Sequence, residues 1–169
     1  MEYILCGIPA DTAGMVRYIG MTEDECSVES VCEVSYSLGR YTLLVSNCTN
    51  ENSGDKQSRN ILSIMYPPDK SKNRRSLGRK KSVSEFIGEG VCSVLEEIGC
   101  KNKRVREYKK STYKYKGVDI IVIKKDEKDL VIARSDRIDG EAALEDVRNK
   151  LSLWVNLIVP PESVHECML

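Results

Sequence analysis

The segment from Ser82 to Lys125 constrains the fold of this chain most, because a helix signal and a hairpin signal follow each other in it. Ser82 and Glu85 have the spacing of a helix capping box, in which two side chains bind free backbone N–H groups. Apolar residues then recur at helical intervals as far as Ile98, and Gly99 can end the helix in a left-handed conformation. We expect an amphipathic helix from Ser82 to Ile98.

Extended segments dominate the rest of the chain. Alternating or aliphatic runs predict strands over residues 2–8, 31–38, 41–48, 60–66, 105–116, 118–125 and 129–138. Turn signals at Gly39-Arg40, Lys116-Gly117 and residues 126–128 join several of them as antiparallel neighbours. Residues 11–21 can hold one or two helical turns, and Asp139 can cap a last helix that reaches Ile158.

The fold class that follows is α+β, with an antiparallel sheet and two main helices. Enough strands are present for the sheet to curl into a barrel. A chain of 169 residues has room for one domain, which we place over residues 1–169. Polar residues predict mobile loops over about 49–58 and 69–81.

Composition excludes several classes. Apolar residues make up 41% and charged residues 31%, and no run approaches the length of a membrane span. The formal net charge is zero, which argues against a general polyanion binder. Seven scattered cysteines lack the close pairs of a disulfide scaffold or a zinc site, so we expect reduced thiols.

The sequence offers no motif for catalysis, for a cofactor or for a metal. His165 is the single histidine and belongs to the last five residues, which favours a surface position. No glycine-rich phosphate loop is present. Barrels that hydrolyse polyphosphates hold a metal with carboxylates spaced Glu-x-Glu, whereas Glu2, Glu33 and Asp136 each stand alone in their expected strands.

The basic run from Arg104 to Lys116 is the strongest candidate for binding. In a regular strand its even positions place cations and Tyr108 on one face, as in proteins that bind single-stranded nucleic acid. Lysines on an exposed edge strand also prevent unwanted pairing, and a basic surface can bind another protein. The residues alone leave all three interpretations open.

The order of these features resembles the family of subunit 18 of the Mediator head module. The resemblance is carried by Met1 to Leu5, by Leu95 to Gly99, by the turn at Lys116-Gly117, by the aliphatic strand ending at Ile123-Lys124, and by the last helix with its short tail. It implies an antiparallel barrel related in shape to tunnel-type RNA triphosphatases but without catalytic activity.

The resemblance also implies a nuclear scaffold in the regulation of RNA polymerase II transcription. Its implied partners are Mediator subunit 20 and the C-terminal helix of subunit 8, with the polymerase machinery contacted indirectly and no direct nucleic-acid contact. The candidate partner-binding residues are Tyr108, Lys110, Tyr113, Lys114, Tyr115, Leu153, Trp154 and Leu157. Two other classes stay open: a tunnel-fold polyphosphate or RNA 5′-triphosphatase with a degenerate metal site, and a single-stranded nucleic-acid-binding module.

Overall fold

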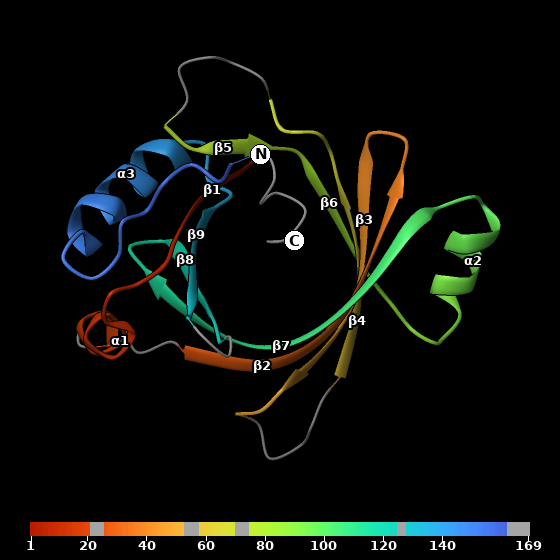
Figure 1. Ribbon diagram of the computed structural model, residues 1–169, viewed down its shortest axis with the longest axis horizontal. Helices are drawn as coiled ribbons and strands as arrows, with labels where there is room; N and C mark the ends of the chain where they lie inside the picture. The colour runs from red at the N-terminus through yellow and green to blue at the C-terminus, as the bar shows by residue number, and fades with distance from the viewer. Residues whose placement is uncertain (21–25, 53–57, 70–74, 125–127, 162–169) are drawn as a thin grey trace.

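A nine-stranded antiparallel sheet bends into a nearly closed ring in the computed structural model of this chain (Figure 1). The structure describes residues 1–20, 26–52, 58–69, 75–124 and 128–161. The strands are β1 (Glu2–Gly7), β2 (Cys26–Leu38), β3 (Tyr41–Asn50), β4 (Ser58–Met65), β5 (Leu77–Arg79), β6 (Lys81–Phe86), β7 (Lys101–Tyr115), β8 (Val118–Ile123) and β9 (Leu130–Ser135). The helices are α1 (Thr12–Gly20), α2 (Val91–Glu97) and α3 (Gly140–Leu151).

The ring closes through the chain itself. Its strand order is β5-β1-β9-β8-β7-β2-β3-β4-β6, so β5 and β6 stand at opposite ends of the sheet. These two strands are consecutive in sequence and are separated by Lys80 alone. Arg79 of β5 pairs with Glu2 of β1, and Lys81 of β6 pairs with Met65 of β4. One extended stretch therefore joins both ends of the sheet.

The largest apolar core lies outside the ring. Helices α1 and α3 cover the outer face of β1, β9 and β8 (Figure 1). Leu5, Ile120 and Val131 point outward from these strands and pack with Leu144 and Leu151 of α3, and all five side chains are fully buried. The next residue along each strand points inward, because side chains alternate across a sheet.

A second outer core lies under α2. Tyr36 and Leu43, from β2 and β3, pack with Leu95 of the helix and with Cys100. The hydroxyl of Tyr36 also donates a hydrogen bond to Glu96, 3.0 Å away. The short helix is thus fixed to the outside of the wall by apolar contacts and one polar contact.

The fold class expected from the sequence is confirmed, and the described residues form three helices where two main ones were expected. The turn at Lys116-Gly117 is also confirmed, since both residues have positive φ angles, of 53° and 75°. A β-carbon on Gly117 would come 2.9 Å from Nη1 of Arg137, so both backbone conformation and space favour glycine there.

The helix expected over residues 82–98 is wrong in its first half. Ser82 to Phe86 belong to β6, and the helix begins at Val91. Alternation along β6 and its pairing with all of β4 from Asn60 onward outweigh the local capping signal. Gly88 and Gly90, with φ angles of 104° and 100°, separate the strand from the helix. The stop at Gly99 is confirmed by its φ of 91°.

The last helix is shorter than expected. It ends at Leu151, so Leu153, Trp154 and Leu157 follow the helix and do not belong to it. Cys6 and Ile158 exchange backbone hydrogen bonds of 2.9 and 2.8 Å, which turns this stretch into an extended partner of β1. Asp139 stands at the N-cap position, but its carboxylate accepts hydrogen bonds from Arg137 and does not cap the helix.

The two expected loops are partly strand. Residues 49–50 end β3, and residues 77–79 form β5 while residue 81 begins β6. Residues 53–57 and 70–74, as well as His165, lie outside the described residues. Within the part of the chain that the structure describes, no helix is long and apolar enough to cross a membrane.

The outer core predicts unequal costs for two leucine substitutions. Leu144→Ala should lower the free energy of unfolding by about 3 kcal/mol, because it removes a fully buried side chain between α3 and the sheet. Leu153→Ala should change it by less than about 0.5 kcal/mol, since Leu153 is 83% exposed. Urea unfolding followed by circular dichroism measures both, and equal costs would contradict the assignment of the core.

Candidate functional site

The inside of the ring is a charged lumen with one apolar wall. It encloses a cavity of about 450 Å³. Ile121, Ile123 and Ile132, from β8 and β9, form one apolar part of its lining, and further aliphatic side chains from the other strands line it as well. The lining also carries three carboxylates and five cations, which are Glu2, Glu29, Glu33, Arg59, Arg79, Lys81, Lys110 and Arg134. The cations exceed the carboxylates by two, so the lining has a net positive charge.

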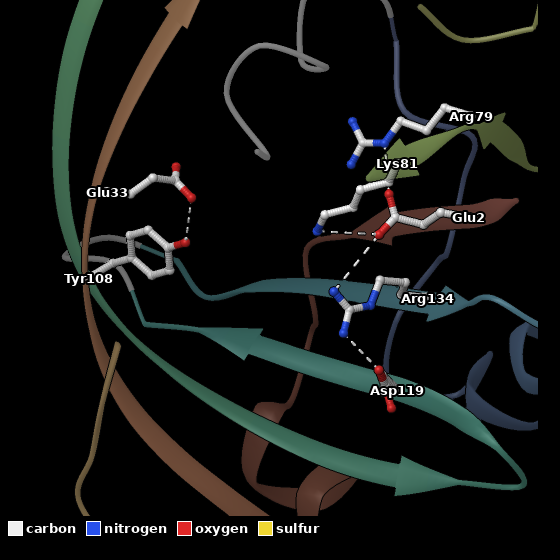
Figure 2. A network of polar contacts seen from close by, with 7 residues as sticks. All are labelled: Glu2, Glu33, Arg79, Lys81, Tyr108, Asp119 and Arg134. Atoms are coloured by element: carbon white, nitrogen blue, oxygen red, sulfur yellow. Dashed lines mark hydrogen bonds and ion pairs between the residues drawn. The ribbon is translucent and has the colours of Figure 1, made fainter. Parts of the chain in front are cut away.

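Glu2 is the centre of the first charge cluster (Figure 2). Its side chain is 8% exposed, and Nε of Arg79 donates a hydrogen bond of 2.8 Å to its Oε2. Lys81 and Arg134 each place a nitrogen 3.8 Å from its Oε1. Burial would raise the pKa of Glu2, but the charges of Arg79 and Lys81 outweigh burial and lower it. Glu2 is therefore a buried carboxylate that stays ionised.

Arg134 extends this cluster from Glu2 to Asp119. Arg134 donates a hydrogen bond of 2.8 Å from Nη2 to Asp119 while its Nη1 faces Glu2. Figure 2 shows Arg134 between the two carboxylates on one side of the lumen. Burial lowers the pKa of Lys81, with the charge of Glu2 acting against that effect. Strands β1, β5, β6, β8 and β9 all contribute to this network.

Glu29 forms a second cluster on the wall made by β2, β4 and β7. Its Oε1 lies 2.7 Å from Arg59, and its Oε2 lies 2.9 Å from Lys110. Burial would raise the pKa of Glu29, but hydrogen bonding to Lys110 and Arg59 and their charges lower it. Each carboxylate oxygen of Glu29 thus has its own cation.

Glu33 is different, because one of its oxygens has no partner. The residue is 4% exposed, and Tyr108 donates a hydrogen bond of 3.3 Å to its Oε2 (Figure 2). Its Oε1 is buried without a hydrogen-bond partner among the described residues. Burial raises the pKa of Glu33, although the charge of Arg106 opposes the shift. Burial and the neighbouring Glu33 also raise the pKa of Tyr108.

The structure divides the predicted partner-binding residues between two faces. Tyr108 and Lys110 line the lumen, where both contact glutamates. Tyr115, which is 2% exposed, belongs to the outer core, and Tyr113 packs against that core. Lys114 is exposed. The even positions of β7 from 108 to 112 therefore face inward, and they do not form an open basic surface.

The three residues after α3 also differ in exposure. Leu153 is 83% exposed, whereas Leu157 is fully buried in the outer core. Trp154 is half-buried and stacks on Tyr18, with ring centroids 4.6 Å apart. Burial corrects the prediction of Tyr115 and Leu157 as surface anchors, because neither side chain can reach a partner without unfolding. Leu153 is exposed, so its side chain can contact a partner.

Sequence reasoning missed much of the lumen. Glu29 shares a strand and a face with Glu33 because β2 begins at Cys26, so the expectation that Glu33 stands alone is wrong. Arg79 and Lys81 were expected in a loop, yet their two-residue spacing was the available signal that both point inward. Within the described ranges, no three His, Cys, Asp or Glu side chains lie close enough to hold a metal ion.

Comparison with known proteins supports the fold. No protein-family model and no curated protein sequence matches the chain. A chain of the Schizosaccharomyces pombe Mediator head module matches with a TM-score of 0.69 and 14% identity, over 94% of this chain and 98% of that one. The PH1012 protein of Pyrococcus horikoshii matches with a TM-score of 0.70 and 17% identity, over 90% of each chain.

A third similar structure has a different described activity. HpAC1 from Hippeastrum, studied as a candidate adenylyl cyclase and described as having a dominant triphosphatase activity, matches with a TM-score of 0.58 and 9% identity. The match covers 99% of this chain and 96% of that one. At identities this low, the TM-scores show a shared fold and nothing beyond it, so the class defined here is a nearly closed antiparallel barrel.

Glu33, with its one unpartnered carboxylate oxygen, predicts how stability changes with pH. Because the pKa of Glu33 is raised in the folded chain, folding favours its protonated form, and its ionisation lowers stability as the pH rises through the folded pKa. Glu33→Gln should therefore raise the free energy of unfolding at pH 7 by about 1 kcal/mol, since it removes the buried charge and keeps an acceptor for Tyr108. The gain should vanish in acid below the ordinary glutamate range. Urea titrations across pH measure it, and a loss of stability at pH 7 would contradict the assignment.

The paired carboxylate predicts the opposite behaviour. The lowered pKa of Glu2 means that its ionised form stabilises the fold above the ordinary glutamate range and that this contribution is lost as the pH falls through the folded pKa. Glu2→Gln should cost about 3 kcal/mol at pH 7, because Arg79 is left buried with an unbalanced charge. The same titrations apply, with Glu89→Gln at an exposed position as the matched control.

Proposed function

We propose that this chain is a non-enzymatic Mediator head subunit of the subunit 18 type, a protein-interaction scaffold in RNA polymerase II transcription within the nucleus. The observation that carries the proposal is the internal pairing of the lumen charges. Glu2 and Glu29 each have two or more cations within 4 Å. The similarity to a Mediator head chain along nearly the whole length supports it.

The pairing argues against metal-dependent hydrolysis inside the lumen. A divalent metal needs carboxylates that converge on one point and that lack competing cations. Arg59, Arg79 and Lys110 lie 2.7 to 2.9 Å from Glu29 or Glu2, where their charges would repel a metal ion. Glu33 contacts Tyr108 and does not join the other two carboxylates in one cluster.

The proposed partners are Mediator subunit 20 and the C-terminal helix of subunit 8, with RNA polymerase II contacted indirectly. A few side chains supply most interface energy in protein complexes, and Trp, Tyr and Arg are enriched among them. Leu153 is 83% exposed, and it directly precedes the half-buried Trp154. We place the candidate contact on this segment after α3.

The proposal predicts recovery of Mediator components with the chain. Tagged protein purified from its own cells should bring down subunit 20 and subunit 8 in near-stoichiometric amounts, measured by mass spectrometry. Leu153→Asp should reduce that recovery several-fold, because it places a charge on the candidate contact. Ile138→Asp is the matched control, since Ile138 is equally aliphatic and fully exposed on another segment.

Two results would contradict the proposal. One is a purification that contains no Mediator component. The other is metal-dependent release of phosphate from RNA with a 5′-triphosphate by the pure chain, which would favour the triphosphatase class instead. If Leu153→Asp and Ile138→Asp reduce the recovery of partners equally, the proposed membership of the complex stands, but Leu153 is not part of the interface.

A further inference from the structure

Strand β6 has an open edge. On one side it pairs with β4, from Asn60 opposite Phe86 to Met65 opposite Lys81. On the other side β1 pairs with this extended stretch as far as Arg79 and no further. In the described part of the chain, no strand pairs with that second edge from Lys81 onward. Such an edge presents backbone N–H and C=O groups that an extended peptide can bind.

A slot lies beside this edge, at the mouth of the lumen. It is a cavity of about 280 Å³. Lys81 and Val83 of β6 line one side. The other lining residues come from the start of the chain, β8 and the end of β9, and they are Met1, Glu2, Asp119, Arg134 and Asp136. Val83 is 56% exposed, which is high for an aliphatic strand residue beside a cavity. An added strand that continues the line of β1 would run through the slot and cover Val83.

The pairing of β1 with β5 fixes the register of such a strand. Glu2 lies opposite Arg79, so an antiparallel strand in line with β1 places alternate residues opposite Lys81, Val83 and Glu85. Lys81 and Val83 line the lumen, and Glu85 shares their face because side chains alternate. Directly opposed residues on one face interact most strongly.

Charge and shape then define the bound sequence. An acidic residue fits opposite Lys81, an aliphatic residue opposite Val83 and a basic residue opposite Glu85. Because the strand runs antiparallel to β6, the order from its N-terminus is basic, any, aliphatic, any, acidic. We infer that β6 binds an extended segment of a partner protein with this pattern, by strand addition to the open edge.

This inference rests on the proposed scaffold role and adds one binding surface to it. The inference can fail while the proposed role stands. The test uses the full chain in isolation, so absence of peptide binding leaves the recovery of Mediator components unaffected. The probe is a fluorescein-labelled peptide, Ser-Lys-Thr-Val-Thr-Glu-Ser. The control peptide, Ser-Glu-Thr-Val-Thr-Lys-Ser, has the same composition and reverses the two charges.

The first peptide should bind about fivefold more tightly than the control in fluorescence anisotropy, because the two cross-strand charge pairs together contribute about 1 kcal/mol. Its binding should also slow hydrogen exchange at backbone amides within residues 82–86. Equal binding of both peptides, or tight binding without slower exchange in β6, would overturn the inference.

Two variants distinguish an effect at the open edge of β6 from an effect of the chain's net charge. Glu85→Lys should weaken the first peptide about threefold, since it places like charges opposite each other. Ser84→Lys adds a similar charge to the outer face of the same strand and should leave the affinity unchanged. Glu85 is suited to this change because its carboxylate is 65% exposed and contacts Arg59 at 3.8 Å.

Three further results would assign the edge to something else and overturn the inference. Inorganic tripolyphosphate should leave the peptide bound, and displacement at low micromolar concentration would indicate an anion site. Peptide binding that emerges after deletion of residues 162–169 would indicate a segment of this chain as occupant. Concentration-dependent self-association abolished by Glu85→Lys would indicate a second copy.

Discussion

The ion pair between Glu2 and Arg79 joins the first strand of the chain to the stretch that closes the ring. Both side chains are buried inside the barrel, where an unpaired charge would be costly. Lys81 and Arg134 share the same carboxylate, so three strands besides β1 depend on Glu2 for charge balance. The polar inside of the barrel is possible because this carboxylate stays ionised.

Charges on the opposite wall of the lumen are also paired with one another. Glu29 balances Arg59 and Lys110, which come from β4 and β7. Glu33 departs from this pairing, since it faces a tyrosine hydroxyl and keeps one oxygen unsatisfied. The lumen carboxylates balance the lumen cations, and these ion pairs link the strands of the barrel to one another. The lumen is poorly suited to holding a divalent metal, which must attract the same carboxylates.

Local sequence predicted the antiparallel meander well, because the turn at Lys116-Gly117 and the aliphatic β8 carry strong short-range signals. It failed at Ser82 to Phe86, where a capping pattern lost to pairing with β4, a strand about twenty residues earlier. The two-residue spacing of Arg79 and Lys81 places both side chains on one face of an extended stretch. Which face is the inside depends on closure of the ring, which no local pattern encodes. Burial of Tyr115 and Leu157 likewise depends on where α1 and α3 dock.

The placement of the main core outside the ring separates two demands on the sequence. The helices and the outward face of the sheet supply most apolar burial, so the fold is held from outside. A substitution of a charged side chain inside the ring therefore leaves the apolar contacts of both outer cores in place, so its cost depends on the charge that it leaves unpaired.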